Sequence, residues 1–292
     1  MVVITPAGST IEGQLLWLFG LDKQPELEFA VREISGNRDA ELDFTVRYIL
    51  DDLGIELEEP ESDRLDSLIE RFGLKFPTTR DFSALARDSL PEIVPGRDDP
   101  DTVLMAWLER EEQLFRRLER IIVSERLVGG FMAGGEADVD GFLSFSLSVQ
   151  NRRKARAGQS LENQLEALFL GHRIRYSRGA ETENRHKPDF LFPGIEEYRN
   201  AAFPAPQLTM LGSKSTLKDR WRQVLTEAER IGEKHLVTLE PAISEHQTDQ
   251  MRQASLQLVL PRRLHDTYRE SQRNWLMSLS DFIGLLAQRQ DL

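Results

Sequence analysis

Three charged residues in the C-terminal half have the types and spacing that phosphodiester chemistry requires. Asp189 precedes an apolar run at 190–192, and Lys214 lies in an alternating run at 208–216, so both runs predict strands. Glu227 follows in a segment whose apolar residues recur at helical spacing. A carboxylate at one strand, a lysine on its neighbour and a carboxylate on the next helix can converge at a sheet end. There they can hold a hard divalent cation beside a phosphodiester.

The hypothesis gives each side chain a role. Hydrolysis of a phosphodiester needs a nucleophilic water, neutralisation of developing charge and help for the leaving oxygen, and Mg²⁺ on carboxylates serves all three needs. Asp189 is then the bridging ligand, with Glu227 or Glu162 as the second carboxylate. Lys214 orients or deprotonates the water and stabilises the transition state. An aspartate and a lysine at this separation also occur in many α/β proteins as a structural pair, so their spacing alone does not decide.

A predicted helix carries two more carboxylates. We expect Ser160 to cap this helix and Gly171 to end it. Glu162 and Glu166 lie four residues apart on one face, so either can reach a neighbouring strand end. A solvent-exposed surface pair is the alternative interpretation.

A basic run ends the preceding predicted helix, which begins at about Asp138. Its cations are Arg152, Arg153, Lys154 and Arg156. They suit a solvated helix end, where they interact favourably with the helix dipole, or a contact with DNA phosphates. We favour the DNA contact because the run is next to the candidate site in the sequence.

The charge of the chain is unevenly distributed. Its 292 residues include 37 Lys and Arg and 49 Asp and Glu, a net charge of −12. Residues 1–70 hold five basic and 17 acidic residues (5 − 17 = −12), and the remainder holds 32 of each. Residues 151–222 hold 14 basic and eight acidic residues, or +6, so the stretch with the candidate chemistry is locally basic.

The composition excludes several classes of site. The chain has no cysteine, which rules out disulfides, zinc–thiolate sites and thiol catalysis. No run approaches about 18 apolar residues and no signal-peptide pattern opens the chain, so we expect a cytoplasmic protein without a membrane partner. The histidines are scattered without ligand spacing, and we assign them no chemistry.

The chain divides into three parts. Residues 1–72 predict a small acidic helical module, which is either a solvated face or a protein-interaction or regulatory element. Residues 73–150 predict a mainly helical subregion, in which Asp99-Pro100 marks the start of a long helix that Gly129 ends. Residues 151–292 alternate strands with helices and predict an α/β core, a mixed β-sheet flanked by helices. Its strands are expected near 174–176, 190–192, 208–216, 235–239 and 256–260.

A longer set of residues resembles the catalytic domain of the EcoRII-type restriction endonucleases, in the PD-(D/E)xK nuclease superfamily. The motifs that carry the resemblance are Lys187-Pro188-Asp189-Phe190-Leu191-Phe192-Pro193, the run from Lys214 to Gln223, and Glu227-Ala228. Weaker matches extend the resemblance over about residues 73–292. In this branch the position two before the lysine, here Gly212, carries no carboxylate. A helix glutamate, here Glu227, substitutes for it, so the departure agrees with the family.

The resemblance implies a restriction-endonuclease-like fold and the activity of a type II site-specific deoxyribonuclease. The expected cofactor is Mg²⁺, held by Asp189, Glu227 and Glu162. The expected substrate is double-stranded DNA with a palindromic CC-GG core, either CCWGG or CCNGG-like.

The resemblance also implies how the sequence is read. Lys218-Asp219-Arg220, with Arg222 beside it, matches the family's element that enters the major groove. An arginine can bond guanine O6 and N7, and an aspartate can accept from the cytosine amino group. Ordinary capping charge at a helix N-terminus is the alternative interpretation. Relatives extrude the central base pair; Trp107 is the candidate stacking residue here, and a buried core tryptophan is the alternative.

The expected partners follow from the same resemblance. A palindrome requires a homodimer with one subunit per strand, and a restriction enzyme is paired in the cell with a cognate DNA methyltransferase. The founding member's large N-terminal effector domain is replaced here by acidic residues that would repel DNA. Two other functions stay open, a structure-specific or repair nuclease of the same fold and a DNA-binding regulator that has lost cleavage.

Overall fold

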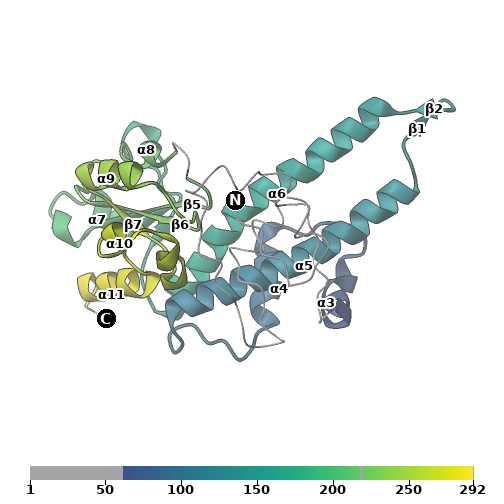
Figure 1. The fold of residues 1–292 in the computed structure, drawn as a ribbon. Helices are drawn as coiled ribbons and strands as arrows, with labels where there is room; N and C mark the ends of the chain where they lie inside the picture. The colour runs from purple at the N-terminus through teal and green to yellow at the C-terminus, as the bar shows by residue number, and fades with distance from the viewer. Residues whose placement is uncertain (1–61, 218–219, 292) are drawn as a thin grey trace, which may run out of the picture. The chain divides into compact units, whose positions relative to one another are not determined.

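The computed structural model describes residues 62–217 and 220–291, which form a helical layer beside a five-stranded sheet (Figure 1). These residues belong to one compact unit, Pro60–Leu292. Of the acidic module expected at 1–72, residues 62–72 are described, and they lie within this unit. The helices expected before residue 62 lie outside the described residues.

The helical layer begins with three short elements, α3 (Ser62–Ile69), η3 (Glu70–Phe72) and α4 (Thr79–Asp88). The Thr78 side chain caps α4 by accepting from the Asp81 amide. These elements bury a shared apolar core against the next helix, α5 (Pro100–Val128). That core contains Leu65, Ile69, Phe82, Leu85, Leu114, Phe115 and Leu118. This packing is the physical reason that residues 62–72 belong to the layer.

Helix α5 begins where its start signal predicted. The Asp99 side chain accepts from the Thr102 amide at 3.0 Å, Pro100 is the first helical residue, and Gly129 follows the last turn. Two short antiparallel strands, β1 (Met132–Ala133) and β2 (Glu136–Ala137), then lead into α6 (Val139–Gly171), and α5 packs against α6. The two helices form a hairpin whose far end extends beyond the rest of the layer (Figure 1).

Helix α6 is one continuous helix of 33 residues, so the expected break between two helices at Ser160 is wrong. Asp138 caps it as predicted, and Gly171 is its last residue. Tertiary contacts override the weak local signal of Gly158 and Ser160. Gln159 accepts from Thr79, and Ser160 is buried in the layer. The helix therefore joins the helical subregion to the α/β core without a boundary at residue 150.

The sheet has the order β3-β4-β5-β6-β7. Its strands are β3 (Ser177–Arg178), β4 (Phe190–Phe192), β5 (Thr209–Lys214), β6 (Lys234–Thr238) and β7 (Leu256–Val259). Strand β4 pairs antiparallel with both β3 and β5, and β6 pairs parallel with both β5 and β7. The predicted mixed sheet is therefore confirmed. The first strand begins just after the expected position at 174–176.

Helices cover both faces of the sheet. The short elements between and after the strands are η4 (Glu183–Arg185), α7 (Ile195–Arg199), η5 (Ala205–Gln207), α8 (Trp221–Val224), α9 (Glu245–Gln253), η6 (Arg262–Thr267), α10 (Glu270–Arg273) and α11 (Leu279–Arg289). Leu191, Met210 and Leu236 pack with α8 and α9 on one face. Phe192, on the other face, lies 5.1 Å from Phe169 of α6 and 5.9 Å from Phe282 of α11, measured between ring centroids.

No helix in the described ranges has the length and apolar character that crossing a bilayer requires.

A buried carboxylate ties the helical layer to the C-terminal helix. The side chain of Asp101 is 4% exposed and accepts from the backbone amides of Arg262, Leu279 and Ser280 at 3.1, 2.8 and 3.0 Å. The Ser280 hydroxyl also donates to it, at 2.7 Å. Asp101 thus satisfies the first amides of α11 and holds that helix against α5.

We expect Asp101→Asn to lower the free energy of unfolding by about 1–3 kcal/mol, because the amide nitrogen cannot accept and leaves buried donors unpaired. Urea denaturation followed by circular dichroism measures the change. Asp249→Asn, at an exposed position of α9, is the matched control and should be neutral. Equal effects of the two substitutions would show that Asp101 does not hold α11 against α5.

Candidate functional site

The register of β4 on β5 brings Asp189 to Lys214. Phe190 is paired with Leu211, so Asp189, one residue earlier, lies opposite Gly212, the residue before Ser213. The Asp189 Oδ2 atom accepts from the Ser213 amide at 2.6 Å and from the Lys214 Nζ atom at 2.9 Å. Both charged side chains are about one-fifth exposed, at 19% and 21%. The predicted pair is therefore formed, at the end of both strands and open to solvent.

Packing explains why the position two before the lysine carries no carboxylate. A Cβ atom at Gly212 would lie 2.9 Å from Val224 Cγ2 and 3.2 Å from its Cγ1. The Val224 side chain of α8 thus fills the space that a side chain at 212 would need. The second carboxylate has to come from elsewhere, and Glu227 follows Val224 by three residues.

Glu227 lies in a turn, so the helix expected around it is wrong. Helix α8 ends at Val224, and Ala228 has a φ of 53°, in the left-handed region that a continuing helix excludes. The apolar spacing that predicted a longer helix arises because Trp221, Val224 and Ala228 all reach the core under the sheet.

The Glu227 carboxylate is the most perturbed acid of the site. Its Oε2 atom is buried and has no hydrogen-bond partner among the described residues. Burial raises the pKa of Glu227 to about 7, the negative charge of Asp189 adds to the rise, and Lys214 and Lys234 oppose it. The influence of both Asp189 and Lys214 on this pKa shows that the three predicted residues share one electrostatic environment.

Glu162, rather than Glu166, is the α6 carboxylate that belongs to this environment. Burial raises the pKa of Glu162, a hydrogen bond from Arg178 opposes the rise, and the charges of Asp189 and Lys214 also act on it. Arg178 donates to Glu162 Oε2 at 2.9 Å and to Glu166 Oε2 at 2.8 Å. The guanidinium therefore holds both carboxylates of the helix against β3.

Two cations near the predicted carboxylates were not among the residues predicted from the sequence. Arg178 reaches Glu162 across the interface between β3 and α6, and Lys234, which is 8% exposed, donates to the Ile231 carbonyl at 2.8 Å. Burial lowers the pKa of Lys234, against the field of Glu227. Neither residue has a local spacing signal, because each meets its carboxylate only through the fold.

The basic run on α6 is largely occupied by contacts within the helical layer. The Arg156 side chain is 10% exposed and pairs with Glu112, with Glu111 at 3.9 Å. Arg153 pairs with Glu119 at 2.6 Å, and the Arg152 guanidinium lies 4.1 Å from the centroid of the Phe76 ring. A further member of the run, Lys154, is exposed.

The predicted readout and stacking residues have different surroundings. Lys218 and Asp219 lie outside the described residues. Arg220 is exposed and donates to the Thr216 carbonyl at 2.9 Å, and Arg222 is exposed and donates to Gln250 at 2.9 Å. Trp107 is 2% exposed in the core of the helical layer, so its ring has no open face for a base.

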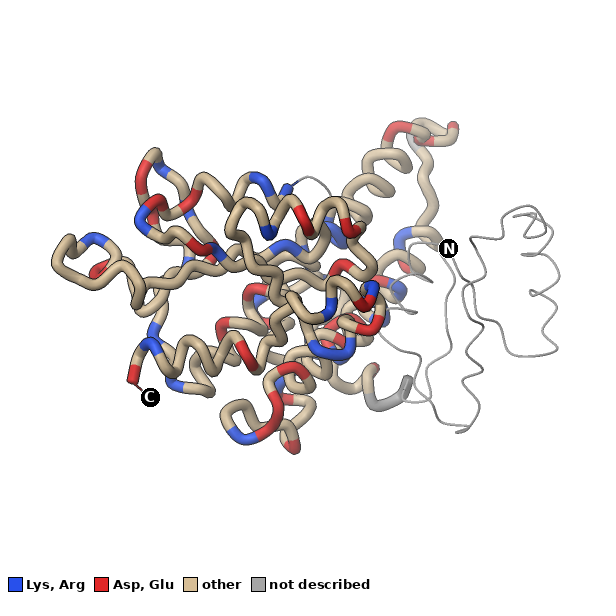
Figure 2. The backbone as a smooth tube through the Cα atoms, turned by 60° about the vertical axis from the view of Figure 1, so that its left-hand side comes forward, with Lys and Arg blue, Asp and Glu red and all other residues tan. Residues whose placement is uncertain are grey.

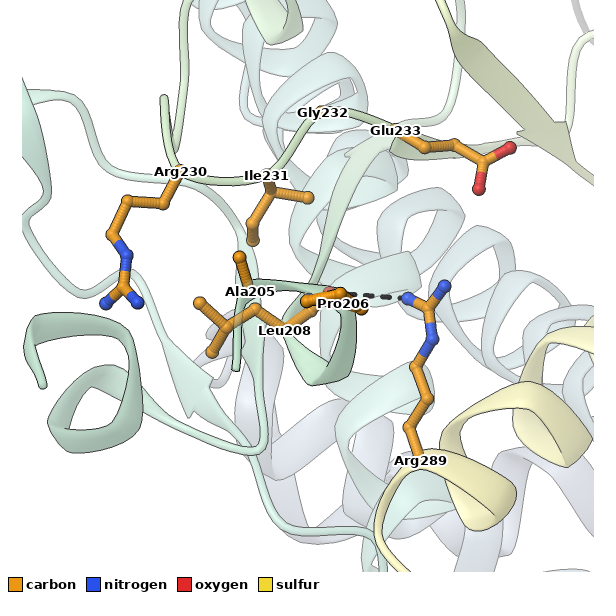
Figure 3. A pocket seen from close by; sticks show the side chains of 8 residues that line it. All are labelled: Ala205, Pro206, Leu208, Arg230, Ile231, Gly232, Glu233 and Arg289. Carbon is orange, nitrogen blue, oxygen red and sulfur yellow. Dashed lines mark hydrogen bonds between the residues drawn. The ribbon is translucent and has the colours of Figure 1, made fainter. Parts of the chain in front are cut away.

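A pocket of about 250 Å³ lies beside the starts of β5 and β6, and Asp189 and Lys214 are not among the residues that line it (Figure 3). It is lined by Ala205, Pro206, Leu208, Arg230, Ile231, Gly232, Glu233 and Arg289. Arg289 donates to the Leu208 carbonyl at 3.3 Å, and Arg230 donates to the Asn200 and Phe203 carbonyls. Both cations therefore donate to backbone carbonyls in the segment that leads into β5, away from the Lys214 end of that strand.

The carboxylates present fit a hard divalent cation. The orphaned Oε2 atom of Glu227 and the second oxygen of Asp189 are oxygen donors without a hydrogen-bond partner in the described part of the chain. Residues 62–217 and 220–291 contain no closed group of three or more acidic or histidine ligands. Asp189 and Glu227 would hold such an ion, and Glu162, which accepts from Arg178, would be a third candidate.

Comparison with known proteins places this geometry in a family. The sequence pattern of the family described as EcoRII C terminal matches residues 115–283. The chain belongs to the EcoRII C-terminal family. It is 38% identical, over 80% of its length, to the type II restriction enzyme EcoRII of Escherichia coli, of which the match covers 56%. It is 28% identical to the type II restriction enzyme SsoII of Shigella sonnei, over 39% of this chain and 40% of that protein. The chain spans about half the length of these relatives or less.

Solved structures show the same fold as this member of the EcoRII C-terminal family. Metal-depleted Ecl18kI in complex with uncleaved DNA superposes with a TM-score of 0.61 at 19% identity, over 79% of this chain and 85% of that one. The PspGI–substrate DNA complex superposes with a TM-score of 0.59 at 15% identity, over 74% and 94%. The expected restriction-endonuclease-like fold is confirmed.

We expect Glu227→Gln to stabilise the protein at alkaline pH. A carboxyl whose pKa is about 7 in the folded state and about 4.5 in the unfolded state takes up protons on folding between those values, so stability falls as pH rises through 7. The glutamine is indifferent to pH. Allowing for partial exposure, we expect about 1 kcal/mol at pH 8, or roughly 2–4 °C in Tm, and no difference near pH 4.5.

Thermal melts across this pH range measure the effect. Glu229→Gln, in the same turn but exposed, is the matched control for the removal of one carboxylate from this turn. A Glu227→Gln difference that is the same at every pH would contradict the raised pKa.

Proposed function

We propose that the chain is a type II restriction endonuclease that hydrolyses phosphodiester bonds of double-stranded DNA at a palindrome with a CC-GG core. The observation that carries the proposal is the Asp189–Lys214 pair, with the unpaired Glu227 carboxylate beside it. Family membership and the fold shared with DNA-bound restriction endonucleases support the same conclusion.

The proposed cofactor is Mg²⁺, with Asp189 and Glu227 as its ligands and Glu162 as a third candidate. The bound ion would supply Lewis-acid polarisation of the phosphate and lower the pKa of a coordinated water. Lys214, held by Asp189, would place its positive charge beside the scissile phosphate and orient the attacking water. Arg178 bonds both Glu162 and Glu166, and its single positive charge would offset part of their repulsion of the incoming phosphate.

Sequence readout is proposed for the segment that leads into α8. Arg220 and Arg222 are exposed and lie close in sequence to Lys214, and Lys218 and Asp219 complete the family's motif. The Arg220 guanidinium, now bonded to Thr216, is free to exchange that bond for guanine O6 and N7. We place no base-flipping pocket at Trp107 because its ring is buried.

The proposed partners are double-stranded DNA, a second copy of the chain that cuts the other strand, and a methyltransferase that protects the same sequence in the cell. DNA phosphates would meet the basic segment at 151–222; the acidic surplus lies in residues 1–70. Figure 2 shows the distribution of the cations and acids along the described backbone.

Incubation with Mg²⁺ and a sequenced plasmid tests the activity. We expect discrete bands whose mapped ends share one palindrome, at an enzyme concentration where Asp189→Asn or Lys214→Met cuts at least about 10³-fold more slowly yet retains DNA binding. Lys187→Met, whose lysine is exposed and pairs with Glu181 at 3.8 Å, is the control and should cut normally. Nicks that follow DNA structure would mean a repair nuclease, and binding without any cutting would mean a regulator.

Arg220→Ala tests the readout. We expect it to cost about 1–3 kcal/mol of binding to the cognate site and to relax the preference at one G·C pair, because a bidentate contact is lost. Filter binding to single-substituted duplexes measures the preference. Arg252→Ala, also exposed but on α9, should leave the preference intact; a uniform loss across all duplexes for Arg220→Ala would indicate a phosphate contact instead.

A further inference from the structure

Glu240 lies just beyond the end of β6 and contacts the segment to which we assign sequence readout. Its Oε2 atom accepts a hydrogen bond from the Leu217 backbone amide at 2.9 Å. The two residues are 23 positions apart in the chain, so the bond depends on the fold. The proposed metal site and the proposed base contacts leave this carboxylate without a role.

The register of β5 on β6 explains how Glu240 reaches the readout segment. Lys214, the last residue of β5, is paired with Thr238, the last residue of β6, and the two strands are parallel. Both strands therefore end at the same edge of the sheet. The chain that leaves β5 leads to Leu217, and the chain that leaves β6 leads to Glu240.

The backbone of Glu240 is fixed at both of its polar groups. Its amide donates to the Thr238 Oγ1 atom at 3.1 Å, and its carbonyl accepts from the Tyr268 hydroxyl at 2.6 Å. Tyr268 is itself 2% exposed. Pro241 follows, and a residue before proline is restricted to extended conformations. The carboxylate thus projects from a rigid base, which reduces the entropy that its hydrogen bond costs.

The bond from Glu240 determines the direction of one peptide group. The Leu217 amide N–H and the Thr216 carbonyl belong to the same planar peptide, in which they point in opposite directions. The Thr216 carbonyl accepts from the Arg220 guanidinium at 2.9 Å, and the Thr216 hydroxyl accepts from it at 2.8 Å. A carboxylate that fixes the N–H side of this peptide therefore also aims the carbonyl that holds the arginine.

The backbone of Arg220 is held through the same residue. The Arg220 amide donates to the Leu217 carbonyl at 2.8 Å, and the Leu217 side chain is 2% exposed in the core under the sheet. Main chain and guanidinium of Arg220 are thus both tied to the stretch that Glu240 holds. Water could satisfy a part-buried amide, but it would not give the peptide a fixed direction.

We propose that Glu240 is a positioning residue for sequence readout. It holds the peptide between Thr216 and Leu217, and this peptide presents the Arg220 guanidinium in a defined place before it exchanges Thr216 for a base. Such preorganisation lowers the cost of ordering the arginine when DNA binds. Glu240 acts through Arg220 and not by contact with DNA. The inference rests on the proposed function, to whose readout it adds a residue from a neighbouring strand.

The sequence preference of Glu240→Ala tests the proposal in the full-length protein with Mg²⁺. The measured quantity is the ratio of kcat/KM for the cognate duplex to kcat/KM for a duplex in which the G·C pair read by Arg220 is replaced. A bidentate contact contributes roughly 5- to 150-fold to such a ratio, so we expect a decrease of about fivefold or more. The decrease should come from slower cutting of the cognate duplex.

Two further variants separate positioning from charge and from general stability. Glu240→Gln keeps an oxygen that can accept from the Leu217 amide and should restore most of the lost preference. Asp98→Ala is the matched control, because Asp98 also accepts from a backbone amide, that of Val94 at 2.8 Å, but lies in the helical layer. It should leave the ratio unchanged. A merely structural role of Glu240 would lower the Tm of Glu240→Ala without changing its ratio.

A double-variant cycle tests whether Glu240 acts through Arg220. In a protein that already carries Arg220→Ala, adding Glu240→Ala should change the ratio little, because the group that Glu240 positions is gone. Residues that act through one contact give such non-additive effects. Two losses that multiply would show that Glu240 acts on another group.

Hydrogen exchange without DNA tests the bond itself. The Leu217 amide should exchange about tenfold faster or more in Glu240→Ala than in the unaltered protein, and at nearly the unaltered rate in Glu240→Gln. Mass spectrometry of overlapping peptides whose ends lie on either side of Leu217 measures the rate.

The outcomes distinguish this inference from the proposed function. An unaltered protein that cuts no DNA would reject the proposed function. A Leu217 amide that exchanges equally fast in all variants would reject the role of Glu240 even in an active enzyme. An unchanged ratio in Glu240→Ala, or a Glu240→Gln protein as unselective as Glu240→Ala, would also overturn it.

Discussion

The antiparallel register of β4 on β5 is the constraint on which the site depends. A shift of one residue would turn Asp189 away from Lys214 and send Phe190 and Phe192 to the opposite face of the sheet. Those rings are fixed by Phe169 and Phe282, so the apolar core behind the sheet determines the position of the charged pair in front of it. The geometry of the candidate site is in this sense a consequence of packing.

The site gathers more negative charge than its exposure would ordinarily allow. The charge of Asp189 acts on both Glu162 and Glu227, and burial is the main cause of the raised pKa values of both glutamates. Lys214 and Arg178 offset part of that charge through direct hydrogen bonds. The carboxylate oxygen atoms without a hydrogen bond form a site whose negative charge a bound divalent cation would neutralise. The cation proposed for the chemistry would therefore also reduce the electrostatic repulsion within the folded protein.

Much of this could be predicted from the sequence because the signals were local. Asp99 and Pro100 mark the start of α5, the apolar runs form strands, and Asp189 accepts from Lys214. The failures came where tertiary contacts override local preference. Helix α6 continues through Ser160 because that residue packs in the helical layer. Glu227 lies in a turn because α8 ends at Val224 and Ala228 has a left-handed backbone conformation.

Arg178 shows a different limit of sequence reasoning. Its partners Glu162 and Glu166 are on the helix that precedes it. The contact forms between β3 and α6, so no regular spacing in the sequence predicts it. The same holds for the buried Trp107, whose aromatic character fits a base platform until its surroundings are known.

The central claim is that Asp189, Lys214 and Glu227 form one metal-dependent centre for phosphodiester cleavage. Anomalous diffraction from crystals of the protein with its cognate duplex and Mn²⁺ tests it most directly. We predict a manganese peak bonded to carboxylate oxygens of both Asp189 and Glu227, with the Lys214 Nζ atom beside the scissile phosphate of the duplex. A peak on other residues, or DNA whose scissile phosphate lies away from these three side chains, would contradict it.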